Sequence, residues 1–232
     1  NFKLKPGQRL AITIYYGAAS PKTTGHPGSR TTSYILSGDN INNDVFSDAV
    51  KTDHWYSLFN IDVNTGEPSH AVAIMGNSIT DGRGSGTNRQ NRWPDILSQR
   101  LLANPYTRNV SVLNFGIGGN CVVRGGLGPT ALDRFDYNIL NQQSVKWLII
   151  LEGVNDLGGT RDPDDASKRT EELIGFLREL KPERNTILER FSQIGVSNTN
   201  AFDSQALLQL KKKYCNSKQC LKCAIGIQLL KK

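Results

Sequence analysis

The sequence predicts an α/β fold in which a doubly wound parallel sheet is flanked by helices. Two observations predict it. A short apolar run, a polar or Gly-rich loop and a helical pattern follow one another three times between residues 70 and 165. The third run, from Lys146 to Leu151, is almost continuously apolar, as expected for a parallel strand that is covered on both faces. At 232 residues, the chain is long enough for one α/β domain, or for one domain plus a smaller module.

Residues 1–69 are predicted to be a β-rich accessory segment. Two runs with strand character, Leu10–Tyr16 and Thr32–Leu36, are separated by clusters of Gly, Pro, Ser and Asn. About 60 residues bury too little surface for much independent stability. We therefore expect this segment to pack beside the main domain.

Residues 70–165 are predicted to be the first half of the α/β domain, with strands at 71–76, 111–115 and 146–151. The first loop leads into a helix whose apolar positions are Trp93, Ile96, Leu97, Leu101 and Leu102. A second helix is expected over 129–140, because Pro129 suits the first turn of a helix.

Residues 166–232 are predicted to be a helical tail, which leaves the sheet incomplete in its C-terminal half. A helix starts at Asp162-Pro163, and shorter helices follow Pro182, one of them stopped by Gly195. No fourth or fifth strand pattern is present. The chain starts at Asn1 without a Met or an apolar leader, which predicts either a processed protein or a fragment.

The net charge of +7 belongs entirely to this tail. Residues 1–165 carry 15 basic and 15 acidic side chains, and residues 166–232 carry 13 and 6. We interpret the lysines as a solvated surface and expect neither a nucleic-acid nor a membrane partner. Cys215, Cys220 and Cys223 match three positions of a plant-type iron–sulfur spacing, but no fourth Cys follows, so free thiols are the preferred interpretation.

Ligands of open α/β sheets bind beside the loops that follow the carboxyl ends of the strands. These loops read Gly76–Gly82, Gly116–Asn120 and Gly153–Asp156. A serine at a tight strand-to-helix turn exposes its hydroxyl and its own N–H, which suits Ser78 as a nucleophile. A glycine lets the backbone approach a reacting carbonyl, and an asparagine amide is an uncharged donor, which suits Gly119 and Asn155. Dinucleotide binding is disfavoured because Gly116-x-Gly118 lacks the third glycine.

Over residues 8–165 the three loops, in this order, resemble blocks I, II and III of the SGNH (GDSL-like) hydrolase superfamily. The stretches Ile79–Gly82 and Asn91–Asp95 resemble more narrowly its xylan-esterase branch. The resemblance implies a flavodoxin-like sheet and a bacterial serine esterase that removes acetyl groups from plant cell-wall polysaccharide such as xylan, secreted or periplasmic, without a metal or organic cofactor. It implies that Ser78 is the nucleophile, and that Ser78 N–H, Gly119 N–H and the Asn155 side chain form the oxyanion hole. The oligomeric state is not determined by the sequence.

The chain departs from this family at two places. Asn77 replaces the usual Asp, although its carbonyl oxygen can still accept a hydrogen bond. The family's base comes from a late Asp-x-x-His block, but no histidine follows His70. His70 itself starts the first strand, roughly 20 Å from Ser78, and His26 and His54 are interpreted as surface or structural residues.

Two functions therefore remain open. One is the serine esterase with an incomplete triad, and the other is a non-catalytic remnant that binds carbohydrate or a protein partner. The charge break and the missing histidine also motivate the hypothesis that esterase sequence ends near residues 165–175 and continues into fused or frameshifted sequence.

Overall fold

The computed structural model describes residues 3–18, 20–58 and 60–230. The chain divides into two compact units, Asn1–Asp156 and Leu157–Lys232. Within the described ranges all strands lie in the first unit, and the second unit is helical. Our division of the sequence at residues 69/70 and 165/166 stays a prediction.

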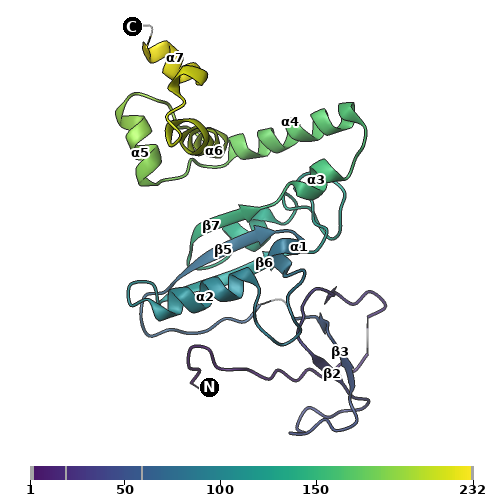
Figure 1. Ribbon diagram of the computed structural model, residues 1–232. Coiled ribbons are helices and arrows are strands. Elements are labelled where there is room, and N and C mark those ends of the chain that lie inside the picture. The colour runs from purple at the N-terminus through teal and green to yellow at the C-terminus, as the bar shows by residue number, and fades with distance from the viewer. Residues whose placement is uncertain (1–2, 19, 59, 231–232) are drawn as a thin grey trace. The chain divides into compact units, whose positions relative to one another are not determined.

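A parallel three-stranded sheet is the centre of the first unit (Figure 1). Its strands are β5 (His70–Gly76), β6 (Val110–Gly116) and β7 (Val145–Leu151), in the order β6-β5-β7. On the central strand β5, Ala73, Ile74 and Met75 are 0% exposed. The predicted α/β class and the positions of all three predicted strands are confirmed, each within one residue of its expected ends. The expectation that the third strand is covered on both faces is wrong, because Trp147 and Ile149 of β7 are 50% and 38% exposed.

Helix α2 (Trp93–Ala103) follows the first loop and packs against β6 (Figure 1). Pro94 lies in its first turn, where a missing N–H costs no hydrogen bond. The Asp95 carboxylate accepts a hydrogen bond of 3.0 Å from Arg92 N–H, which closes the helix start. The helix predicted here is confirmed.

The predicted regular helix over 129–140 is wrong in its first half. Residues 131–134 form turns, and only a short π-helical segment, η1 (Asp136–Leu140), follows them. Ala131 N–H and Leu132 N–H donate to carbonyl oxygens of the preceding loop, at Cys121 (2.9 Å) and Val122 (3.1 Å). These contacts draw the start of the segment onto the loop, so tertiary packing overrides the local helix preference.

The β-rich segment contains two short antiparallel pairs. They are β1 (Gly25–His26) with β4 (Trp55–Tyr56), and β2 (Ser33–Ile35) with β3 (Val50–Thr52). The predicted strand at Thr32–Leu36 is thus confirmed, but the one at Leu10–Tyr16 is wrong. A strand needs a neighbour for its backbone hydrogen bonds, and no described residue pairs with that run, whose large side chains are 39–50% exposed.

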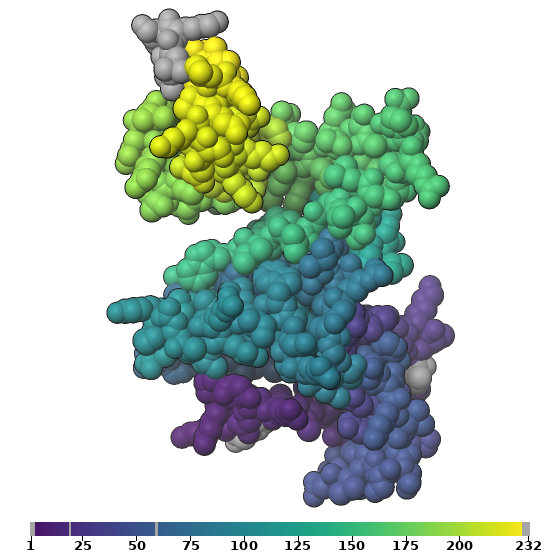
Figure 2. Space-filling model, in the orientation of Figure 1, coloured from purple at the N-terminus to yellow at the C-terminus, as the bar shows by residue number. Residues whose placement is uncertain are grey.

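This segment packs against the α/β part of its own unit, as expected (Figure 2). Ser29 is 0% exposed, and its carbonyl oxygen accepts a hydrogen bond from Arg92. Asn88 bridges the same two regions, since it receives an N–H from Thr32 at 2.9 Å and donates its side-chain amide to the Thr32 hydroxyl at 2.7 Å. Hydrogen bonds therefore attach the segment to the loop that follows β5.

The second unit is built from α4 (Pro163–Glu179), α5 (Thr186–Gln193), α6 (Ala201–Leu210), η2 (Lys211–Cys215), η3 (Cys220–Lys222) and α7 (Ala224–Leu230). Asp162 caps α4 and Gly195 follows α5, as predicted. Phe176, Leu188 and Leu207 are buried where α4 and α5 pack against α6. No described helix of the chain is long and apolar enough to span a membrane.

Candidate active site

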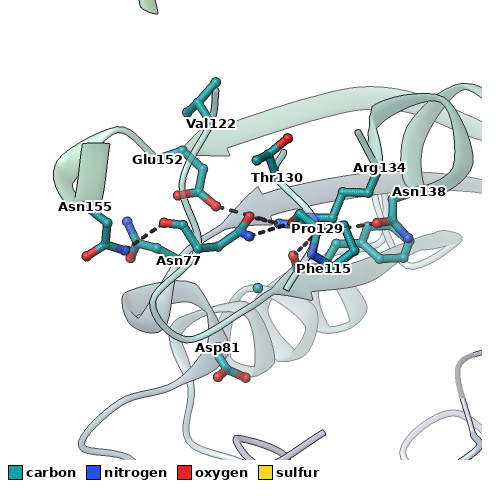
Figure 3. Close-up of polar contacts among 12 residues, drawn as sticks. Asn77, Asp81, Phe115, Val122, Pro129, Thr130, Arg134, Asn138, Glu152 and Asn155 are labelled. Atoms are coloured by element: carbon teal, nitrogen blue, oxygen red, sulfur yellow. Dashed lines mark hydrogen bonds and ion pairs between the residues drawn. The ribbon is translucent and has the colours of Figure 1, made fainter. Parts of the chain in front are cut away.

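The loops that carry the predicted site residues meet at one end of the sheet. Gly76 at the end of β5 pairs with Gly116 of β6 and with Leu151 of β7, so the three strands end level with one another. Asn155 Nδ2 donates a hydrogen bond of 2.7 Å to the carbonyl oxygen of Asn120, which joins the third loop to the second (Figure 3). The structure therefore places Ser78, Gly119 and Asn155 in the segments that follow the carboxyl ends of the three strands, at the same end of the sheet.

Ser78 begins a single helical turn, α1 (Ser78–Asp81), directly after β5. The buried Asn77 side chain caps this turn by accepting a hydrogen bond of 3.0 Å from Ile79 N–H. The turn is tight at Gly76, where a Cβ atom would lie 2.1 Å from the Thr80 hydroxyl oxygen. Asn77, where the resembled family usually has Asp, therefore still caps the turn that Ser78 begins.

The second loop is shaped by Gly119, whose φ of 73° lies in the left-handed region that favours glycine. Its carbonyl oxygen accepts Leu127 N–H at 2.9 Å. The N–H of Gly118 donates to Asp81 Oδ2 at 3.0 Å. By contrast, the N–H groups of Ser78 and Gly119 have no acceptor within the described residues, so both are free to bind an external oxygen atom.

The third loop holds the second in place through Asp156, which is 0% exposed. Its carboxylate accepts hydrogen bonds from Val122 N–H, at 3.0 and 2.9 Å, and from Val123 N–H, at 3.1 Å. Asn155 lies in α3 (Val154–Gly158) and directs its side chain to the second loop. One amide hydrogen of Asn155 is used there, and the amide carries a second.

A buried polar cluster lies beside these loops (Figure 3). Arg134 Nη1 donates to Phe115 O at 2.7 Å, and Nη2 donates to Asn120 Oδ1 at 2.8 Å and lies 3.6 Å from Glu152 Oε1. The Glu152 side chain is 1% exposed. Burial raises the pKa of Glu152 to about 7, although the charge of Arg134 lowers it in part.

None of the three histidines is hydrogen-bonded to Ser78. His70 lies at the opposite end of β5, as expected, with Nε2 2.9 Å from Lys146 Nζ. His54 Nδ1 lies 2.8 Å from Pro27 O. His26 Nε2 is 2.6 Å from Asp81 Oδ1, on the helical turn that Ser78 begins. Within the described residues, the Ser78 hydroxyl has no hydrogen-bond acceptor that could remove its proton.

Sequence reasoning missed the polar residues that hold the loops, namely Asp81, Asn120, Arg134, Glu152 and Asp156. A signal existed for Glu152, because a carboxylate directly after an almost fully apolar strand is expected to be buried and to need a partner. Arg134 lies between Ala131 and Phe135 and carried no comparable signal. No group of three or more potential metal ligands occurs among the described residues.

Comparison with protein families matches residues 74–213 to the GDSL-like Lipase/Acylhydrolase family. The match continues past residue 165, where the resemblance of the three loops ends. No curated protein sequence matches the chain significantly.

Several solved structures are similar to the chain. The crystal structure of AlinE4, an SGNH-hydrolase family esterase, is 19% identical, with 65% of this chain and 75% of that chain covered and a TM-score of 0.37. A carbohydrate acetylesterase family member from Sinorhizobium meliloti is 18% identical, with 66% of this chain and 80% of that chain covered and a TM-score of 0.36. A family two carbohydrate esterase from Clostridium thermocellum, in complex with cellohexaose, is 15% identical, with 69% of this chain and 57% of that chain covered and a TM-score of 0.32. The chain spans 58% of the length of an AlinE4 mutant structure.

Proposed function

Because the chain belongs to the GDSL-like lipase/acylhydrolase family, we propose that it is a serine esterase in which Ser78 is the nucleophile. The observation that carries the proposal is the pair of unoccupied N–H groups of Ser78 and Gly119, on loops whose strands end level with each other. Two backbone donors and a side-chain amide at one sheet edge form a suitable cradle for an oxyanion.

In the proposed reaction, solvent water takes the hydroxyl proton of Ser78 and later returns a proton to the departing alcohol. The Ser78 oxygen attacks an ester carbonyl carbon, and the carbonyl oxygen becomes an oxyanion. Ser78 N–H, Gly119 N–H and the Asn155 amide donate to that oxyanion. Collapse of the tetrahedral intermediate expels the alcohol and leaves an acyl-serine, which water hydrolyses to a carboxylic acid and free Ser78. These steps use no metal or organic cofactor.

The proposed substrates are acetyl esters on plant cell-wall polysaccharide, xylan in particular, reached by a secreted or periplasmic protein. Support comes from the xylan-esterase-like motifs at Ile79–Gly82 and Asn91–Asp95. Arg92 and Asp95 act structurally in this second motif, because Arg92 binds the β-rich segment and Asp95 caps α2. A fused or frameshifted origin of residues 166–232 stays a prediction, although the family match reaches residue 213.

A second candidate function is a carbohydrate-binding or partner-binding remnant without turnover. It is favoured by the histidines, because none follows His70 in the sequence and His26 is bound to Asp81. The serine esterase differs from this remnant in its expected rate: with an oxyanion hole and substrate binding but no base, we expect it to hydrolyse esters roughly 10³-fold above the uncatalysed rate.

Hydrolysis of p-nitrophenyl acetate by the purified chain, beside Ser78→Ala at the same folded concentration, separates the two. Turnover that requires Ser78 supports the esterase. A rate far above the value expected without a base would indicate that a base takes part. Rates equal to those of Ser78→Ala would rule out serine catalysis. Retention of that inactive protein in an acetylated-xylan gel would then support the remnant.

A further inference from the structure

Arg134 is a buried cation that the proposed reaction does not use. Its side chain is 6% exposed, and it extends from the irregular segment before η1 toward the ends of β6 and β7 (Figure 3). Each end of its guanidinium meets a different part of the site. Nη1 donates to the carbonyl oxygen of Phe115, one residue before the end of β6. Nη2 donates to Asn120 on the second loop and faces Glu152, which directly precedes the third loop.

The contact with Asn120 matters because Asn120 connects the proposed oxyanion donors. It follows Gly119 directly in the chain, and its carbonyl oxygen accepts the Asn155 amide at 2.7 Å. Its own side-chain amide donates to Leu127 O at 2.9 Å and to Pro129 O at 2.8 Å. Arg134 donates a hydrogen bond to Asn120 Oδ1, so every polar group of the Asn120 side chain has a partner.

Asn120 is 0% exposed, so its orientation cannot be maintained by water. If its Oδ1 atom lost the guanidinium, a buried acceptor would be left without a partner, and the side chain would rotate or the loop would move. Either change displaces the carbonyl oxygen that holds Asn155 and the peptide that carries Gly119 N–H.

Glu152, between β7 and the third loop, faces the same guanidinium at 3.6 Å and helps to keep it in place. It follows β7 directly and precedes Asn155 by three residues. Arginine is suited to this position because its planar fork can donate to two separate acceptors and face a carboxylate at the same time, whereas lysine offers one point charge. Asp156 adds the second link between these loops through Val122 and Val123.

From this arrangement we propose that Arg134 is a positioning residue, which sets the distance between the Gly119 N–H and the Asn155 amide by holding Asn120 and Glu152. The expected effect of Arg134 on turnover rests on the proposed function, whereas its effect on the position of the loop does not. The oxyanion is stabilised only in the transition state, so loss of this positioning lowers kcat and leaves KM nearly unchanged.

The test compares Arg134→Lys and the double variant Arg134→Met/Glu152→Gln, which removes both buried charges and so avoids an unpaired one. Arg108→Met is the matched control, because Arg108 is an exposed arginine of the same unit. The first readout is amide hydrogen exchange over residues 116–127 relative to β5. We expect exchange in this loop to rise about tenfold in the double variant, with β5 unchanged, and Arg134→Lys to fall between it and the wild type.

The second readout is the Ser78-dependent hydrolysis of p-nitrophenyl acetate. We expect kcat to fall about 10- to 100-fold with KM within about twofold. Unchanged loop exchange in folded variants would overturn the proposal, as would an equal rise in β5, which indicates general destabilisation. If the wild type shows no Ser78-dependent turnover, the proposed function fails, and the exchange measurement alone decides the role of Arg134.

Discussion

His26 Nε2 lies 2.6 Å from Asp81 Oδ1, so a histidine of the β-rich segment is bound to the short helix that Ser78 begins. The other carboxylate oxygen of Asp81 accepts Gly118 N–H at 3.0 Å. One buried carboxylate therefore connects three regions of the chain: the accessory segment, the helical turn that Ser78 begins and the loop of Gly119.

This connection predicts an energetic coupling between His26 and Asp81. In a double-mutant cycle with His26→Gln and Asp81→Asn, we expect a coupling energy of about 1 kcal/mol, measured by urea unfolding. Asp81→Asn alone is expected to cost more than His26→Gln, because it also weakens the contact with Gly118. Additive single effects would contradict the coupling.

Gly28 is predicted to be required for packing of the accessory segment. A Cβ atom at this position would lie 2.0 Å from Asp81 Oδ2, so Gly28→Ala forces the Asp81 carboxylate or the segment to move. We expect a loss of about 1–3 kcal/mol in the free energy of unfolding. Gly66→Ala is the matched control, because a Cβ there meets no atom within 4 Å. Equal stability of the two variants would show that the segment does not pack here.

Glu152 is predicted to make the fold less stable as the pH rises from about 4.5 to 7. Its pKa is raised to about 7 in the folded protein, so between these pH values the unfolded chain has released a proton that the folded chain still holds. The free energy of unfolding therefore falls by about 3 kcal/mol in total, and the decline levels off once the pH has passed the folded-state pKa of about 7.

The measurement is urea unfolding from pH 4.5 to 8 of the wild type, Glu152→Gln and the control Glu67→Gln, which replaces an exposed carboxylate. The decline should be shallower in Glu152→Gln and unchanged in Glu67→Gln. Parallel curves for all three proteins would mean that Glu152 titrates as an exposed carboxylate does.

The edge of β7 predicts self-association. Within the described residues, β7 pairs with β5 alone, and Trp147, Ile149 and Leu151 are 50%, 38% and 41% exposed. These side chains share one strand face next to an unpaired edge, a combination that favours pairing with another chain. We expect a concentration-dependent increase in mass in size-exclusion chromatography with light scattering, reduced by Trp147→Lys. A sharp, stable monomer peak at all concentrations would count against it.

Much of the α/β half of the chain could be predicted from local patterns. The runs that form β5, β6 and β7 are apolar and are followed by glycine-containing loops, so their position follows from composition alone. The placement of the three loops at one edge follows from parallel pairing. Leu10–Tyr16 shows the limit of such reasoning, because its apolar residues suggest a strand but a strand exists only if a partner lies beside it.

By itself, the sequence determined the order of the three parallel strands, the three loops with Ser78, Gly119 and Asn155, and the absence of a histidine after His70. Only the tertiary structure decided how these loops are held. The partners Arg134 and Asn120 are 14 residues apart, and His26 and Asp81 are 55 residues apart. Apolar periodicity is a local property, whereas the partner of a buried polar group depends on which distant segments approach it once water is excluded.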